Sequence, residues 1–421
     1  MKKLFKQIIS DFHENELKLV KERSLKVDLN SWKIISIIWP RRAWKSSYLF
    51  SLIWQLISSW SSKMNIVYIN FEDERINIQW NELSVAMDAY SELYPDINLN
   101  DVHFFFDEIQ NINWREKFIR RIYDEWVKHI YITWSNAKLL SSEIATALRW
   151  RSIAYELLPL SFSEFLYFNW FDWNKFSSKW KSKLISLQTE YLKWWGFPEL
   201  IWLKEETKTK IIQEYFDVMI YNDIIERYEI KDATLLKQFI KLLLQCATKE
   251  FSVNKIADTL KTQWFKFDKN ILYTFVDYLN TVYFSQSVSK RDKSLRKQVL
   301  KKIYTFDTWY LTAINFKFSS DDWKRLENTL FQYLYRKYGN NIFFLKNWSE
   351  TDFIVPLWGQ TLIYQSCFEL NETNKSREIQ WCIDAMKKFG EENAFIITAE
   401  QEEKIVINWY TINILPFYDL E

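Results

Sequence analysis

Apolar, β-branched runs recur along the first part of the chain. They predict strands at residues 33–38, 65–70, 101–106 and 129–133, while residues 46–58 carry apolar side chains at helical spacing. A strand that is apolar throughout is buried on both faces, as in a parallel sheet covered by helices. The pattern therefore predicts an α/β fold with a parallel sheet for the N-terminal part of the chain.

The middle of the chain has a different pattern. Residues 171–222 are predicted to be helical. Residues 253–260 and a segment that begins at Asp268 predict two helices joined by a turn, and residues 282–289 and 299–306 predict two alternating strands. This order of helices and strands is that of a winged helix.

From residue 309 on, helices and strands alternate again. A helix from Leu326 to Tyr338 precedes predicted strands at residues 341–345, 350–355 and 361–368. Three domains are therefore predicted: an α/β domain, a helical and winged-helix region, and a second α/β domain. Their expected boundaries are residues 1–166, 167–308 and 309–421.

Tryptophan and glycine have unusual frequencies in the chain. It contains 23 Trp and 4 Gly, whereas a typical composition would give about 29 Gly. The two counts together come close to that expectation. Some bacteria read the UGA codon as glycine, and translation of such a gene with UGA as tryptophan would write Trp at these positions. We therefore interpret most Trp positions as glycine.

The alternative is a protein that is truly rich in tryptophan. Trp prefers cores and interfaces, yet Trp60, Trp309 and Trp323 lie beside small polar residues that are typical of loops. Trp114 is the position that fits the glycine interpretation least.

The segment IIWPRRAWKSSYLF, residues 37–50, joins the first predicted strand to the first predicted helix. It matches the phosphate-binding pattern G-x-x-x-x-G-K-[ST], except that Trp39 and Trp44 stand at the two glycine positions. In this pattern Lys45 neutralises the β- and γ-phosphates, and the Ser46 hydroxyl binds Mg²⁺. Because tryptophan would fill the volume that phosphate needs, ATP binding is predicted for the glycine form; a chance match is the alternative. The residues predicted to bind nucleotide are Trp39, Pro40, Arg41, Arg42, Ala43, Trp44, Lys45, Ser46 and Ser47.

The third predicted strand ends in two carboxylates, Asp107 and Glu108. An apolar strand that ends in this way is the second half of an ATPase site. Asp107 is predicted to hold Mg²⁺ through water, and Glu108 to orient and polarise the attacking water. The alternative is an exposed acidic strand end.

Three segments carry a resemblance to a known family. With Trp150 read as glycine, residues 148–166 resemble the signature L-R-G-R … L-P-L-S-F-x-E-F of a large family of prokaryotic AAA+ ATPases. Residues 195–199 (WGFPE) and 223–228 (DIIERY) resemble two further signatures of that family. Its members join an AAA-type ATPase domain to a C-terminal domain usually called DUF4143.

The resemblance also implies roles for single residues. Arg149 or Arg151 would lie near the γ-phosphate, in its own or a neighbouring subunit, and a structural ion pair is the alternative for each. A polar residue at the end of the fourth strand, Ser135 or Asn136, would sense the γ-phosphate, or would instead cap the following helix.

A basic segment, KRDKSLRK, lies between the two strands of the predicted winged helix and runs from Lys290 to Lys297. A hairpin tip with this charge could contact the phosphate backbone of DNA. The alternatives are a solvated turn, or a winged helix that serves only for packing within the protein.

The resemblance further implies a restriction-endonuclease-like C-terminal domain. In such sites a helix Glu, a strand Asp and a downstream Glu-x-Lys bind Mg²⁺ and activate water. Glu327 and Asp352 fit the first two positions, but Gln365, Ser366 and Cys367 stand at the third, without a carboxylate or a lysine. We therefore expect a degenerate site without nuclease activity, in a domain that could still bind nucleic acid or a partner.

The remaining composition narrows the function. The net charge of +2 implies no general polyanion partner, the three cysteines have no metal or disulfide spacing, and no apolar run is long enough to cross a membrane. We expect a cytoplasmic ATPase that binds ATP and Mg²⁺, uses them to move or gate its C-terminal domains, and could self-associate. The alternative is a nucleotide-gated switch that binds DNA or a partner with little turnover.

Overall fold

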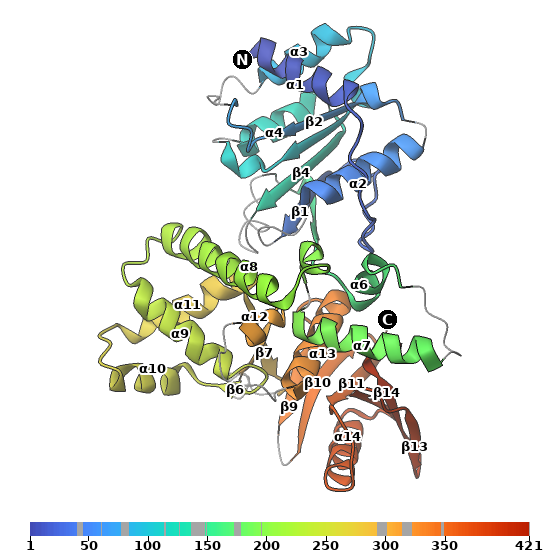
Figure 1. Ribbon diagram of the computed structural model, residues 1–421, viewed down its shortest axis with the longest axis vertical. Coiled ribbons are helices and arrows are strands. Elements are labelled where there is room, and N and C mark those ends of the chain that lie inside the picture. Colours follow the sequence, from blue (N-terminus) through green and yellow to red (C-terminus); the bar gives the residue numbers. More distant parts are fainter. Residues whose placement is uncertain are drawn as a thin grey trace. The chain divides into compact units, whose positions relative to one another are not determined.

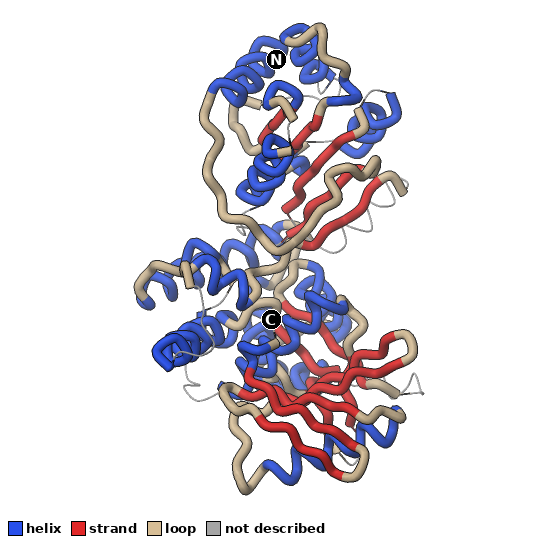
Figure 2. The backbone as a smooth tube through the Cα atoms, turned by 90° about the vertical axis from the view of Figure 1, so that its right-hand side faces the viewer, coloured by secondary structure: helices blue, strands red, loops and turns tan. Residues whose placement is uncertain are grey.

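The structure is a computed structural model of the chain. The residues that it describes are 1–39, 45–59, 61–76, 84–112, 115–125, 127–135, 148, 150–171, 178–194, 196–292, 301–313, 322–346 and 349–420. The chain divides into two compact units, Met1–Leu158 and Pro159–Glu421, called here the N-terminal and the C-terminal unit. Figure 1 labels their helices and strands, and Figure 2 separates the two classes by colour. The three domain boundaries expected from the sequence stay a prediction.

A five-stranded sheet forms the centre of the N-terminal unit, with strand order β2-β3-β4-β1-β5 and parallel pairing throughout. Its strands are β1 (Ile34–Trp39), β2 (Ile66–Asn70), β3 (His103–Asp107), β4 (His129–Ser135) and β5 (Ser152–Glu156). Its helices are α1 (Lys2–Glu14), α2 (Lys45–Ser58), α3 (Ser84–Leu93) and α4 (Arg115–Glu125). The predicted parallel α/β fold is therefore confirmed. Strand β5 was not predicted, because it lies at the edge of the sheet and lacks an apolar run.

Alternation along the strands separates the two faces of this sheet. Phe104 and Phe106 of β3 belong to a buried apolar cluster that includes residues of α1, α3 and α4. The residues between and after them, Phe105 and Asp107, point to the opposite face. Helix α2 contributes to that second face, because its Ser46 contacts Asp107. The carboxylate at the end of β3 is thereby directed toward the beginning of α2.

A nine-stranded mixed sheet forms the centre of the C-terminal unit, in the order β13-β14-β12-β11-β10-β9-β7-β8-β6. Its strands are β6 (Glu250–Phe251), β7 (Ser285–Lys290), β8 (Lys301–Thr305), β9 (Phe343–Lys346), β10 (Glu350–Leu357), β11 (Gln360–Ser366), β12 (Asn393–Thr398), β13 (Glu403–Ile407) and β14 (Tyr410–Pro416). The α-helices of the unit are α6 (Phe162–Phe168), α7 (Ser178–Trp194), α8 (Glu205–Val218), α9 (Ala233–Gln245), α10 (Val253–Thr262), α11 (Lys269–Thr281), α12 (Trp309–Ala313), α13 (Asp322–Tyr338) and α14 (Lys375–Phe389). A π-helix, Met219–Glu226, continues α8.

The elements predicted for the winged helix are present in their expected order. Helices α10 and α11 are followed by the antiparallel pair β7 and β8. However, β7 also pairs in parallel with β9, so the two strands of the predicted wing belong to the large sheet. The winged-helix interpretation therefore stays a prediction. In the described part of the chain, no helix is both long and apolar enough to cross a membrane.

Candidate active site

The carboxyl ends of the parallel strands bring the predicted ATPase residues to one edge of the sheet. Strand β1 ends at Trp39, which pairs with Ser135 at the end of β4, and Asp107 at the end of β3 pairs with Asn70 at the end of β2. Helix α2 begins at Lys45, the lysine of the phosphate-binding pattern. A helix N-terminus at such an edge presents backbone N–H groups to an anion.

Part of the predicted nucleotide site lies outside the described residues. This applies to Pro40, Arg41, Arg42, Ala43 and Trp44. Trp39 and Lys45 are placed as the last residue of β1 and the first residue of α2, and Ser47 lies in the first turn of α2. The strand, loop and helix order that the phosphate-binding pattern requires is therefore present, while the loop itself stays a prediction.

Asp107 is the centre of the described site. Its carboxylate is fully buried. The Ser46 hydroxyl donates to its Oδ2 at 2.6 Å, the Tyr68 hydroxyl donates to the same oxygen at 2.8 Å, and the Thr133 hydroxyl donates to Oδ1. Burial, and next the charge of Asp107, raise the pKa of Tyr68, so this hydroxyl keeps its proton and remains a donor. Three hydroxyl groups from three elements thus compensate one buried carboxylate.

Glu108 has a special backbone conformation. Its φ of 53° and ψ of 44° lie in the left-handed region, which few non-glycine residues adopt. Its backbone N–H donates to Thr133 Oγ1 at 2.8 Å, and its carboxylate accepts from the Gln110 side chain. Strained conformations of this kind cluster at functional sites. The geometry fits a carboxylate that is held in place, at the position directly after Asp107.

The chemistry of the donor set fits a magnesium nucleotide. Mg²⁺ prefers oxygen ligands and is usually bound by one or two carboxylates together with substrate phosphates. Ser46 Oγ and Asp107 Oδ2, which lie 2.6 Å apart at the beginning of α2, provide a hydroxyl and a carboxylate oxygen. These two residues would hold the cation, and the N-terminus of α2 would face the phosphates.

The residues predicted to act on the γ-phosphate are only partly described. Arg149 and Asn136 lie outside the described residues, and the side chain of Ser135 is not described. The polar group of β4 that contacts Asp107 and Glu108 is Thr133, a residue without a predicted role. Its position could have been inferred from the parallel register, since Phe106 pairs with Ile132 and Thr133 therefore lies beside Asp107.

Arg151 lies at the other end of the sheet. Strand β5 runs parallel to β1, with Ser152 opposite Ile34, so Arg151 precedes the amino end of the strand. The phosphate loop follows the carboxyl end of β1, about 16 Å further along the strand. The Arg151 guanidinium pairs with Asp124 at 2.8 Å. Arg151 thus forms an ion pair of the kind given as the alternative, and its predicted role near the γ-phosphate stays a prediction.

Comparisons with family models and with known relatives show which family the chain belongs to. Residues 31–166 match a family model described as an AAA domain. A protein of Methanocaldococcus jannaschii that is described as uncharacterised is 35% identical over 431 residues, which cover 99% of this chain and 94% of the archaeal protein. The chain belongs to the same family as this archaeal protein. Its N-terminal unit contains the AAA-domain match and is built on a parallel sheet.

Two further comparisons are weaker. An uncharacterised protein of Haemophilus influenzae is 29% identical over 368 residues, which cover 86% of this chain and 88% of that protein. The Orc1 protein of Aeropyrum pernix, solved in complex with DNA, is similar over 73% of this chain and 88% of its own, with 9% identity and a TM-score of 0.29. A likeness this weak identifies no shared function.

The prediction of a C-terminal DUF4143 domain is wrong. Residues 186–320 match a different family model, described as a domain of unknown function, DUF8612. This segment contains the predicted signature DIIERY, which the structure places at the end of the π-helix. Short signatures of this kind identified the AAA domain correctly, but they were too few to assign the second domain.

The basic hairpin between β7 and β8 is described only at its first residues. The Lys290 side chain is mostly buried and lies 3.8 Å from Asp292, and the Arg291 guanidinium lies over the Phe343 ring at 4.9 Å. Both cations are therefore engaged within the unit. The remaining residues of the predicted DNA contact, 293–297, lie outside the described part of the chain, so DNA binding stays a prediction.

A second cluster of charges is buried in the C-terminal unit. Glu327 of α13 and Asp352 of β10, the two residues predicted from the endonuclease pattern, lie together as expected. Between them lies Lys302 of β8, whose Nζ is 2.8 Å from Asp352, 2.9 Å from Glu350 and 3.4 Å from Glu327. Burial lowers the pKa of Lys302, but the charges of Asp352 and Glu327 raise it by more, so the lysine is an ammonium ion.

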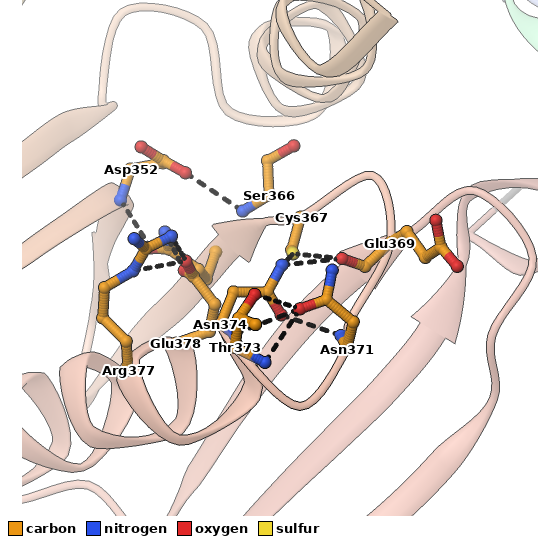
Figure 3. A network of polar contacts seen from close by, with 10 residues as sticks. Asp352, Ser366, Cys367, Glu369, Asn371, Thr373, Asn374, Arg377 and Glu378 are labelled. Atoms are coloured by element: carbon orange, nitrogen blue, oxygen red, sulfur yellow. Dashed lines mark hydrogen bonds and ion pairs between the residues drawn. The ribbon is translucent and has the colours of Figure 1, made fainter.

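The third position of the endonuclease pattern also contacts this cluster. The Gln365 side chain accepts from the Asp352 backbone N–H at 3.1 Å and donates to Glu378 at 2.8 Å. Figure 3 shows the Ser366 backbone N–H donating to the Asp352 carboxylate, and Arg377 beside Glu378. A lysine therefore does lie between Glu327 and Asp352, but it comes from β8, which is distant along the chain and lies outside the sequence pattern. The expected absence of nuclease activity stays a prediction.

Proposed function

We propose that the protein is a Mg²⁺-dependent ATPase whose nucleotide state moves or gates the C-terminal unit. The observation that carries this proposal is the 2.6 Å contact between the Ser46 hydroxyl and the Asp107 carboxylate, at the edge where the N-terminus of α2 meets the ends of the strands. The AAA-domain match over residues 31–166 supports it. Trp39 through Ser47 would bind the nucleotide.

The residues of this site would divide the work. Ser46 and Asp107 would hold Mg²⁺, which supplies charge neutralisation at the β- and γ-phosphates. Lys45 would neutralise the same phosphates from the start of α2. Glu108 would orient the attacking water and accept its proton, and the bond from its backbone to Thr133 keeps the glutamate beside the metal site.

Phosphate release from ATP tests the proposal. The full-length chain as printed is compared with a double variant, Trp39→Gly with Trp44→Gly. We expect Mg²⁺-dependent phosphate release from the double variant, loss of nucleotide binding with Lys45→Ala, and a turnover about 100- to 10,000-fold lower with Glu108→Gln. Glu92→Gln, a surface change that leaves the site intact, serves as the control. No ATP-dependent release in either form, with no effect of Glu108→Gln, would remove the enzyme proposal.

One observation favours a second candidate, a nucleotide-gated switch with little turnover. The Glu108 carboxylate is engaged by the Gln110 side chain, which competes with water for the same oxygen. A switch differs from an ATPase in two measurements: nucleotide binding depends on Lys45, and no phosphate release is detected. DNA and a second copy of the chain are the partners to be tested against it, by gel filtration and by DNA binding with and without nucleotide.

We also propose that most tryptophans of the printed chain are glycine in the natural protein. Among the described residues, eight other than glycine have a positive φ, and three of these are Trp150, Trp170 and Trp264, with φ of 65°, 55° and 68°. The left-handed region favours glycine. All three indole rings are largely exposed to solvent, so they gain none of the stabilisation that burial of apolar surface gives.

A hairpin supports the same proposal. Strands β13 and β14 are joined by the two-residue loop Asn408-Trp409, in which Asn408 has a φ of 58°. Asn-Gly is the sequence that such a loop prefers, and the Trp409 ring is exposed. The codons for Trp39 and Trp44, and peptide masses of the protein purified from its own cells, test the proposal. Codons UGA and peptide masses of glycine are expected, and UGG codons would overturn it.

A further inference from the structure

Tyr68 of β2 contacts Asp107 in the candidate active site, although it belongs to neither of the two sequence motifs. Its hydroxyl donates to Asp107 Oδ2 at 2.8 Å, the oxygen that also accepts from Ser46. Tyr68 pairs with Phe105 two residues before the end of β3, so its ring lies on the face of Asp107 and extends toward the carboxyl edge. The phosphate-loop pattern includes no residue of this kind.

The ring of Tyr68 is held from two sides. Its centroid lies 4.9 Å from that of Phe50 in α2 and 5.9 Å from that of Phe12 in α1. Aromatic pairs at these separations stabilise one orientation of the ring. The hydroxyl is therefore aimed at Asp107 by packing, and one of the packing residues lies on the helix that follows the phosphate loop.

We propose that Tyr68 is a positioning residue for Mg²⁺, which fixes the Asp107 carboxylate without touching the cation. The proposal rests on the proposed ATPase function. Ser46 would contact the cation as well as Asp107, whereas Tyr68 contacts the carboxylate alone, so Tyr68 is the donor that holds Oδ2 independently of the cation. Groups that orient a metal ligand in this way change metal affinity by about 10- to 100-fold when they are removed.

Tyr68→Phe tests the proposal, because it removes the hydroxyl and keeps the ring between Phe12 and Phe50. The full-length chain is used in whichever of the two phosphate-loop forms binds nucleotide. Binding of a fluorescent ADP analogue is measured in EDTA and over a Mg²⁺ titration. We expect the Mg²⁺ concentration for half-maximal effect to rise about tenfold, while the affinity in EDTA stays unchanged. The loss should be smaller with Mn²⁺, since Mg²⁺ demands near-ideal octahedral geometry.

Tyr90→Phe is the matched control. Tyr90 lies in the same unit, and its hydroxyl also makes a 2.8 Å hydrogen bond, but to the backbone oxygen of Met64. It should leave the Mg²⁺ titration unchanged. Superimposable titrations for Tyr68→Phe and the parent chain would overturn the positioning role alone, whereas absence of Mg²⁺-dependent binding in the parent chain would overturn the proposed function as well. If Tyr68→Phe does not fold, Tyr68→His keeps a flat ring that is too short to reach Asp107 and carries the same expectations.

Discussion

Thr133 Oγ1 accepts the backbone N–H of Glu108 at 2.8 Å and donates its own proton to Asp107 Oδ1. One hydroxyl on β4 therefore connects the predicted metal ligand with the predicted base. Glu108 needs this support, because its left-handed conformation costs about 1–2 kcal/mol for a residue with a side chain. A residue on the neighbouring strand thus holds the carboxylate of Asp107 and the backbone of Glu108.

Thr133→Val keeps the shape of the side chain and removes both hydrogen bonds. We expect turnover to fall about 10- to 100-fold, because the carboxylate that is proposed to hold Mg²⁺ and the backbone that carries Glu108 both lose a hydrogen bond. Nucleotide binding in EDTA should change little, since Thr133 contacts neither the loop segment nor α2 through a described hydrogen bond. Steady-state phosphate release, separated into kcat and KM, measures the effect.

The control for this change is Thr274→Val, which removes a threonine hydroxyl bonded to the Asn270 backbone in a helix of the C-terminal unit. It should leave kcat unchanged. An unaltered kcat in Thr133→Val as well would show that the two hydrogen bonds do not contribute to turnover.

The positions of Ser46, Asp107 and Glu108 at one edge of the sheet could be predicted because they belong to motifs that are local in sequence. The phosphate-loop segment and the Asp107-Glu108 pair each follow an apolar run, and parallel strands bring such ends to one edge. Tyr68 and Thr133 were missed because each lies inside an apolar run, where Tyr and Thr are common strand residues and indicate no function. Only the register between strands shows that they face Asp107.

The C-terminal unit could be predicted less completely. Most of its elements from α7 to β11 were recognised, although α9, α12 and the short strand β6 were not. Glu327 and Asp352 were placed together correctly. The partner that neutralises them, Lys302, comes from a hairpin that was assigned to a separate winged helix, although β7 and β8 continue the same sheet. Pairing between distant strands decides this contact, and no local pattern in the sequence encodes it.

Lys302 is expected to be essential for the stability of the C-terminal unit. Lys302→Met removes the ammonium and leaves Glu327, Glu350 and Asp352 close together without their cation. Breaking a buried ion pair by removal of one partner costs about 3–5 kcal/mol. Urea unfolding, followed by far-ultraviolet circular dichroism, measures the loss.

Lys237→Met provides the comparison for Lys302→Met. Lys237 pairs with Asp217 at 2.9 Å, but both side chains are at least half exposed. An exposed pair contributes about 0–1 kcal/mol. If the two variants lose similar stability, the buried cluster does not depend on its lysine.

Because of Glu327, we expect the C-terminal unit to lose stability as the pH rises. Burial, and next the charge of Asp352, raise its pKa to about 8. The folded state therefore holds this proton more tightly than the unfolded state, so the contribution is complete below about pH 4 and is lost as the pH rises through 8. Urea unfolding between pH 5 and 9 should show a decline that Glu327→Gln reduces; parallel profiles for the two proteins would contradict the assignment.

Because of His103, we expect the opposite pH dependence in the N-terminal unit, whose stability should fall as the pH falls. Burial, and next the neighbouring charge of His129, lower its pKa to about 4, and the two imidazole rings stack at 4.5 Å. The neutral form is favoured in the fold, so this stability is present above about pH 6.5 and is lost as the pH falls toward 4. His103→Phe should flatten the acid side of the unfolding profile, and an unchanged acid slope would rule His103 out as its cause.

Gly196 should tolerate no side chain. Its φ is 111°, and an added Cβ would overlap the Asp307 carboxylate, which is buried beneath it. Gly339 has a φ of 58° but open space around the same position, so Gly339→Ala should cost only the backbone strain of about 1–2 kcal/mol. Gly196→Ala adds displacement of a buried group to that strain, and we expect a clearly larger loss in urea unfolding. Equal losses would show that Asp307 moves aside freely.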